Sequence, residues 1–149
     1  MEESTQFIAF LQMSITPVAL ISGVGLLLLT ITNRLARTID RSRKLITLLE
    51  NADGDKKQRL IQELALMYKR SKLLRNSIGS IVVSMFLNAL IIPLLFFMSL
   101  YQWDLRIEGY VLFFTAMIGI LVGLSYFMGD VVITLRGLKM DVSSVLPKK

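Results

Sequence analysis

Apolar residues are gathered into three long blocks along the chain, and polar residues separate the blocks. The blocks cover residues 7–33, 77–100 and 109–135. A helix needs roughly 20 apolar residues to cross a hydrocarbon core about 30 Å thick, and each block is long enough to do so. The pattern therefore predicts an all-α membrane protein with three transmembrane helices.

Between the first two blocks, the apolar positions narrow to single residues spaced by four and three, as in heptad packing between helices. The first run is Leu35, Ile39, Ser42, Ile46 and Leu49, and the second is Leu60, Leu64, Met67, Ser71, Leu74 and Ile78. Residues 51–55, Asn-Ala-Asp-Gly-Asp, have the composition of a turn. We therefore expect residues 34–76 to form an antiparallel helical hairpin that extends spans one and two.

The composition agrees with a single membrane domain over residues 1–149, ending in a short basic tail at 136–149. Charged residues make up 19% of the chain and hydrophobic residues 54%, whereas soluble domains usually have about 25% charged residues. The chain has no Cys and no His, which removes thiol nucleophiles, the usual general base and the commonest metal ligand. We expect neither an enzyme nor a metal or cofactor site.

The basic residues predict the orientation in the membrane. Twelve Lys and Arg residues lie between spans one and two and four follow span three, whereas the turn between spans two and three has only Arg106. Lys and Arg accumulate in cytoplasmic loops. We therefore expect the N-terminus outside and the hairpin and C-terminus in the cytoplasm. Since this bias accounts for the basic residues, a nucleic-acid partner is not needed to explain them.

Span two has a polar stripe. Its members recur at spacings of three and four and so share one helix face: Ser77, Ser80, Ser84 and Asn88. Such a face either packs as a polar seam between helices or lines a hydrated path. Pro93 follows the stripe and is expected to kink the helix, because it lacks a backbone donor.

Small residues and a second proline predict close helix packing in the other two spans. Gly119 and Gly123 form a Gly-x-x-x-Gly pair in span three, and Gly23 lies on a stripe of small and polar residues in span one. Thr16-Pro17 allows two interpretations. Pro17 either kinks span one or begins the main helix with Thr16 as its N-cap.

Charged residues gather where the helices are expected to leave the cytoplasmic side of the membrane. The basic members are Arg34, Arg37, Arg41, Lys72, Arg75 and Arg136. They either bind anionic lipid headgroups or form a ring of charge at the inner mouth of an ion path. Asp130 is the one acidic residue inside a predicted span. It either pairs with Arg34, Arg37 or Arg75 or provides a cation or proton site.

Several short motifs resemble those of the DUF2721 family of bacterial membrane proteins. They are Thr-Pro-Val-Ala-Leu-Ile-Ser-Gly at 16–23, Asn-Arg-Leu-Ala-Arg at 33–37, Asp-Arg-Ser-Arg at 40–43 and Arg-Ser-Lys-Leu-Leu-Arg-Asn-Ser-Ile at 70–78. The resemblance covers nearly the whole chain. It implies a small protein of the bacterial inner membrane, and it brings no catalytic or binding residues with it.

Two functions fit these features. In the first, the protein is a homo-oligomeric ion channel or transport protein, with a path along the symmetry axis lined by span two, because three spans are too few to enclose a path alone. In the second, it is a membrane-tethered scaffold or sensor whose cytoplasmic hairpin binds a protein partner. Anionic membrane lipids are expected partners in both cases.

Overall fold

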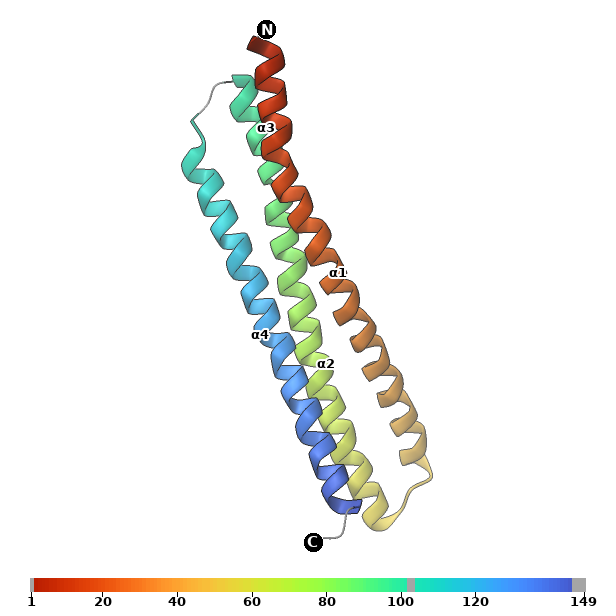
Figure 1. Cartoon of the computed structure of the whole chain (residues 1–149). Helices are drawn as coiled ribbons and strands as arrows, with labels where there is room; N and C mark the ends of the chain where they lie inside the picture. Colours follow the sequence, from red (N-terminus) through yellow and green to blue (C-terminus); the bar gives the residue numbers. More distant parts are fainter. Residues whose placement is uncertain (1, 102–103, 146–149) are drawn as a thin grey trace. The chain divides into compact units, whose positions relative to one another are not determined.

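The chain is built from four α-helices in the computed structural model, which describes residues 2–101 and 104–145 (Figure 1). Helix α1 covers Glu2–Glu50, α2 Gly54–Ala89, α3 Ile91–Tyr101 and α4 Arg106–Val145. Three stretches are long and apolar enough to cross a membrane: Ser14–Glu50, Gly54–Met98 and Arg106–Gly137. The prediction of an all-helical protein with three membrane helices is confirmed.

Pro17 lies inside α1 and does not begin a helix. The interpretation in which Thr16 caps a helix starting at Pro17 is therefore wrong. Proline has no N–H and leaves the carbonyl of residue i−4 without its usual donor. Such an interruption is tolerated within membrane helices when neighbouring groups satisfy the freed backbone atoms.

The segment between α1 and α2 has the turn chemistry expected from its sequence. Gly54, the first residue of α2, has a φ of 58°, in the left-handed region that glycine enters without steric cost. The backbone N–H of Ala52 donates to the carbonyl of Leu49 at 3.4 Å. Three residues, 51–53, are therefore enough to join two long helices.

The second membrane stretch is interrupted three residues before its proline. Helix α2 ends at Ala89 and α3 begins at Ile91, with Leu90 between them in a turn. Backbone hydrogen bonds continue across the interruption, from Leu90 N–H to Phe86 and from Leu94 N–H to Leu90. Pro93 cannot donate to the carbonyl of Ala89, which accounts for the break at this point.

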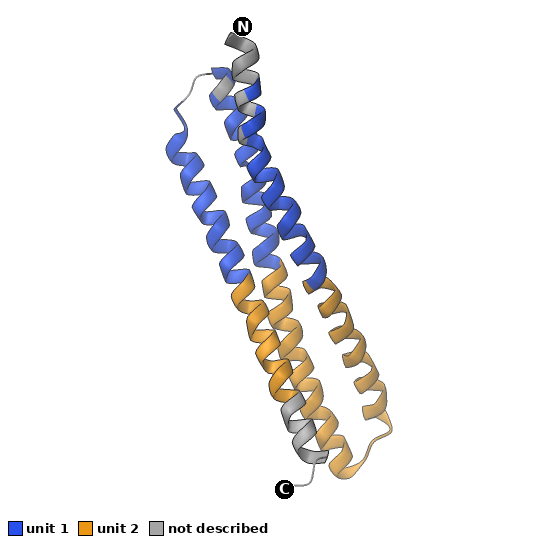
Figure 2. Cartoon of the chain, viewed as in Figure 1, with its two compact units in different colours: residues 1–30, 79–123 blue, residues 31–78, 124–149 orange. Residues whose placement is uncertain are grey.

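The chain divides into two compact units, coloured separately in Figure 2. Unit 1 contains residues 1–30 and 79–123, and unit 2 contains residues 31–78 and 124–149. Buried apolar residues of unit 1 are Val24, Ile81, Ile91 and Ala116, and those of unit 2 are Ile31, Leu45, Ala52, Met67 and Leu74. Sixteen of the 17 basic residues lie in unit 2, so unit 2 has a net charge of +9 and unit 1 of −3.

The buried face of α1 in unit 2 differs from the predicted one by one residue. Its buried members are seven residues apart: Ile31, Thr38 and Leu45, followed by Ala52 in the turn. The predicted Ile39 and Ile46 are exposed. On α2, the predicted Met67 and Leu74 are buried. The heptad period was predicted correctly for both helices. On α1 the positions of Ile39 and Ile46 were wrong, whereas Leu35, Ser42 and Leu49 of the predicted run are half-buried.

Candidate functional site

Asp130 is the centre of a buried charge cluster in unit 2. Its side chain, on α4, has no exposed surface. Arg70 on α2 donates from Nε to Oδ1 at 2.9 Å. Arg34 on α1 places Nη2 3.0 Å from Oδ2, an ion pair without a hydrogen bond. Since a buried carboxylate is costly unless paired, the two arginines explain how it is tolerated.

The cluster joins the α1, α2 and α4 segments of unit 2 through one carboxylate. Arg34 also contacts Phe127 on α4. The guanidinium carbon of Arg34 lies 5.2 Å from the centre of the Phe127 ring, within the range of a cation–π contact. Arg70 is the more enclosed partner, with 16% of its side chain exposed against 32% for Arg34. The carboxylate and the ring therefore orient both guanidinium groups.

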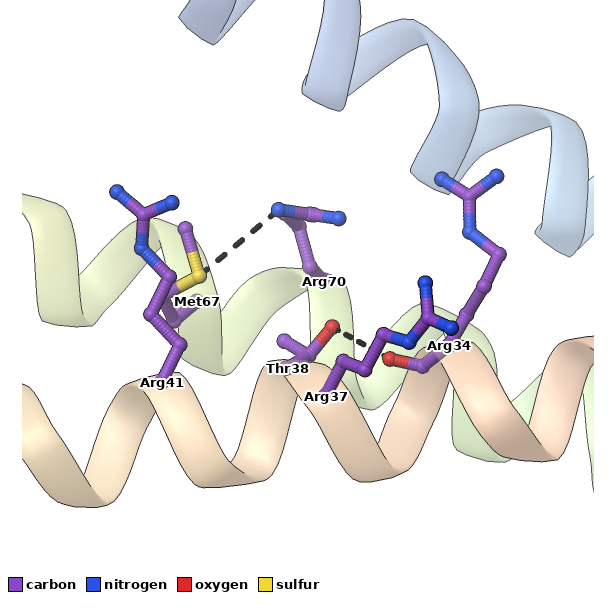
Figure 3. Close-up of a pocket in the computed structure, with 6 residues that line it drawn as sticks. All are labelled: Arg34, Arg37, Thr38, Arg41, Met67 and Arg70. Atoms are coloured by element: carbon purple, nitrogen blue, oxygen red, sulfur yellow. Dashed lines mark hydrogen bonds between the residues drawn. The ribbon is translucent and has the colours of Figure 1, made fainter.

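Beside this cluster lies an open cavity of about 460 Å³. Figure 3 shows the six residues that line it: Arg34, Arg37, Thr38, Arg41, Met67 and Arg70. The side chains from α1 and α2 project to the same side in this view. Arg41 is held by Glu63 on α2, with Nη2 2.6 Å and Nε 3.2 Å from the same oxygen, Oε1. The cavity thus has four guanidinium groups along its wall.

The polar stripe of span two is used inside unit 1. Ser80 and Ser84 on α2 donate to backbone carbonyls of α4. Ser80 donates to the carbonyl of Gly119 at 2.8 Å, and Ser84 donates to the carbonyl of Ala116. Asn88 donates from Nδ2 to the carbonyl of Pro17 on α1 at 3.0 Å. Ser84 and Asn88 are buried. Their geometry is that of a seam between helices of one chain.

Ser77, the first member of the stripe, belongs to unit 2 and is also fully buried. Together with Ser84 and Asn88 it lies on a heptad face of α2 that continues without a change of spacing. The buried members of this face are Met67, Leu74, Ser77, Ile81, Ser84 and Asn88. This face of α2 therefore contains both apolar and polar buried side chains.

The three glycines predicted to mediate packing differ in their surroundings. A Cβ added at Gly119 would lie 3.0 Å from Cβ of Ser84, so glycine at this position permits close contact between α2 and α4. Gly123 is buried. A Cβ added at Gly23 would meet nothing within 4 Å among the described residues, so the packing role of Gly23 stays a prediction.

The predicted inner-mouth residues are only partly brought together. Arg34 and Asp130 form the buried pair, and Arg34, Arg37 and Arg41 line the cavity. Lys72, Arg75 and Arg136 are exposed and do not line it. Of the three predicted partners of Asp130, only Arg34 is in contact with it in the part of the chain that the structure describes.

Arg70 and Glu63 were missed as site residues by the sequence analysis. A signal for Arg70 exists in its spacing, because it follows Met67 by three residues and precedes Leu74 by four, on the buried face of α2. A charged residue at such a position needs a partner. Across the described ranges 2–101 and 104–145, no group of three or more His, Cys, Asp or Glu side chains could hold a metal ion.

Comparison with known proteins gives a family. No curated protein matches the chain, and no solved structure does. The family model described as a protein of unknown function, DUF2721, matches residues 14–140. The matched range contains the described part of the charge cluster, the cavity and the polar stripe. The chain belongs to the DUF2721 family.

Proposed function

We propose that this protein is a membrane-tethered scaffold or sensor whose cytoplasmic hairpin, residues 34–76, docks a helix of a protein partner. In this proposal the protein is not an enzyme. Three helices cross the bacterial inner membrane, with the N-terminus outside and the C-terminus in the cytoplasm. The distribution of basic residues supports this orientation, because sixteen of 17 lie in unit 2.

The observation that carries the proposal is an apolar strip left exposed on the charged helices of unit 2. Ile39 and Ile46 on α1 are 38% and 48% exposed, and Ile61 and Tyr68 on α2 are 49% and 73% exposed. Each pair is seven residues apart. Exposed apolar side chains arranged in a strip on a water-facing surface are typical of an interaction site.

The heptad positions support placing the two pairs on one surface. Ile39, Ile46 and Tyr68 each follow a buried residue directly: Thr38, Leu45 and Met67. In an antiparallel helix pair, the residues that follow the facing positions lie on the same side of both helices. The four side chains would then border one groove, of the kind that receives the apolar face of an amphipathic helix.

The charge of unit 2 specifies the partner further. With a net charge of +9, unit 2 would attract a docking helix flanked by Asp and Glu, because complementary charges speed encounter and reject wrong partners. The stripe of span two gives less support to a channel. Ser80, Ser84 and Asn88 donate to carbonyls of the same chain, so these donors are already used and are less suited to line a path along an oligomer axis.

The proposal is tested by photo-crosslinking in intact cells. A photoreactive amino acid at Ile46 or Tyr68 should capture the same protein, and the matched probes at Leu45 and Met67, one residue away and buried, should not. The captured protein is then purified. An Ile46→Asp variant should bind it about tenfold more weakly, because an apolar anchor is lost. Capture of only lipid or only copies of this chain at both exposed positions contradicts the proposal.

A labelling experiment separates the scaffold from the channel. Because the chain has no Cys, single-cysteine variants need no background removal. Ser84 is buried and Ala89 is exposed. In membranes we expect water-soluble thiol reagents to leave both Ser84→Cys and Ala89→Cys unlabelled, since one is enclosed and the other faces lipid. Labelling of Ser84→Cys alone, together with ion flux in liposomes, would favour the channel.

A further inference from the structure

We infer that the arginine-lined cavity of unit 2 binds a phosphate group, carried either by a lipid headgroup or by a soluble phosphate compound. This site does not depend on the docking of a protein partner. Its wall has guanidinium groups from Arg34, Arg37 and Arg41 on α1 and from Arg70 on α2 (Figure 3). The inference follows from the charge, the free donors and the rigidity of these groups.

The guanidinium groups at the cavity carry an excess of positive charge. Two carboxylates pair with three of the four guanidinium groups: Asp130 with Arg34 and Arg70, and Glu63 with Arg41. Two positive charges are therefore uncompensated at one cavity. Like charges on successive helical turns repel each other, and a bound anion removes this cost. A phosphate dianion would match the excess charge.

Several N–H donors of these arginines are not used by contacts within the described residues. A guanidinium has five N–H donors. Within the described residues, Arg37 has no hydrogen-bond or ion-pair partner, and the contacts of Arg41 with Glu63 use Nε and Nη2, which leaves Nη1. Arg70 donates from Nε to Asp130 and from Nη1 to Met67, which leaves Nη2. Free N–H groups from both helices are therefore available to one ligand.

The remaining lining restricts the kind of ligand. The Thr38 hydroxyl donates to the carbonyl of Arg34 at 2.9 Å, so its proton is already used, and Met67 offers only a weak acceptor. The site presents donors with no competing carboxylate beyond those already paired. Cations are disfavoured, and the planar forks of arginine suit the oxygens of phosphate in bidentate contacts.

Three of the four guanidinium groups are held in place by contacts within unit 2. Arg34 is fixed between Asp130 and the ring of Phe127, Arg70 by Asp130, and Arg41 by Glu63. Arg34, Arg37 and Arg41 follow one another at three and four residues, which places them on one face over about 10 Å of helix. Ordering a long side chain on binding costs free energy. Most of these arginine side chains are already ordered before a ligand binds, so this cost is smaller.

Phosphate binding is tested with the purified full chain in nanodiscs of zwitterionic phosphatidylcholine. Inorganic phosphate and pyrophosphate are titrated in, and binding is followed by calorimetry. The test variant is Arg37→Gln, which removes the arginine that has no partner in the described structure and so breaks no ion pair. The matched control is Arg43→Gln, which makes the same charge change at an exposed position outside the cavity.

We expect Arg37→Gln to weaken binding about tenfold or more, since a charge-assisted contact is lost, and Arg43→Gln to change it less than twofold, as for a distant screened charge. A second set of nanodiscs contains phosphatidylglycerol. If this lipid competes with phosphate in the unmodified chain, or raises its thermal stability in a manner that requires Arg37, the source is the headgroup. Binding of free phosphate without such competition assigns a soluble ligand.

Two results would overturn the inference. One is equal weakening by Arg37→Gln and Arg43→Gln, which would indicate diffuse attraction to a basic surface. The other is no binding of phosphate or pyrophosphate combined with no Arg37-dependent effect of phosphatidylglycerol. Neither result bears on the crosslinks at Ile46 and Tyr68, so the docking proposal is tested separately.

Discussion

The two units solve the same problem, the burial of polar side chains between helices, with different chemistry. In unit 1, Ser80, Ser84 and Asn88 donate to backbone carbonyls of neighbouring helices. In unit 2, Asp130 is buried against Arg34 and Arg70. A neutral donor needs one carbonyl, and every helix offers many. A carboxylate needs cations at defined positions, so unit 2 depends on specific side chains to a degree that unit 1 does not.

The polar groups of the two units also differ in what they can do beyond packing. The polar groups of unit 1 are largely occupied by the chain itself, which makes them a means of joining helices. Unit 2 retains more donors and more charge than its own contacts use, as the cavity beside Asp130 illustrates. Excess charge and unoccupied donors are the features that a ligand can exploit. Ligand binding is therefore expected in unit 2.

The largest expected effect is the loss of the buried carboxylate. Asp130→Ala leaves two partly buried guanidinium groups without their anion, so we expect the free energy of unfolding to fall by about 3–5 kcal/mol. The measurement is reversible unfolding in mixed detergent micelles. Glu63→Gln is the control, since its pair with Arg41 is more exposed and should contribute at most about 1 kcal/mol. Equal losses for the two variants would refute the distinction between them.

A steric change in unit 1 should come second. Gly119→Ala places a Cβ 3.0 Å from Cβ of Ser84, and the resulting overpacking between α2 and α4 is expected to cost about 1–3 kcal/mol. At Gly23 no described residue lies within 4 Å of the added atom. Gly23→Ala should instead stabilise the helix by up to about 1 kcal/mol, because alanine has less conformational freedom to lose. Thermal unfolding of both variants checks the opposite signs.

Loss of a neutral polar contact should matter less. Asn88→Leu removes the hydrogen bond from Nδ2 to Pro17, and such bonds between membrane helices contribute about 1 kcal/mol or less. It also removes Oδ1, which has no hydrogen-bond partner in the described structure, and this offsets part of the loss. We expect a net change below about 1 kcal/mol. A decrease as large as that of Asp130→Ala would show that the two units are alike.

The smallest effect concerns an exposed pair in the turn before α4. The Arg106 guanidinium donates a hydrogen bond to Asp104 at 2.8 Å. This hydrogen bond and the positive charge of Arg106 both lower the pKa of Asp104 from 3.8. The pair therefore contributes stability above pH 3.8, and the contribution is lost as pH falls through the lower pKa of the folded state. Carbon-13 NMR titration of the Asp104 carboxyl should give a higher midpoint in Arg106→Gln. An unchanged midpoint would mean that the contact does not persist in solution.

The charge cluster illustrates how much of the site could be predicted. Asp130 was recognised as unusual because a carboxylate within an apolar block is costly, and Arg34 was among its expected partners. Arg70 was missed, although its spacing from Met67 and Leu74 places it on the buried face of α2. Twelve basic residues lie between spans one and two, and the sequence does not say which of them pairs with Asp130. Selecting one cation from so many requires the position of α4 against α1 and α2 within unit 2.

The apolar strip of α1 illustrates the same limit. The predicted run and the observed buried run both repeat every seven residues. The predicted run has Ile39 and Ile46, and the buried run has Thr38 and Leu45, each one residue earlier. A heptad pattern defines a period but does not define which of two adjacent strips faces the neighbouring helix. The Thr38 hydroxyl donates to the carbonyl of Arg34, which lowers the cost of burying this polar side chain.

The sequence by itself determined the helical class, the three membrane helices, the turn at Gly54 and the position of the polar stripe. These features follow from local properties, because the length and hydropathy of a segment and the backbone freedom of a glycine depend only on neighbouring residues in the sequence. Only the tertiary structure decided that Arg70 pairs with Asp130, that the stripe donates to Pro17, Ala116 and Gly119, and that Ile39 and Ile46 remain exposed. Those outcomes depend on side chains from helices far apart in the sequence, whose approach no single segment encodes.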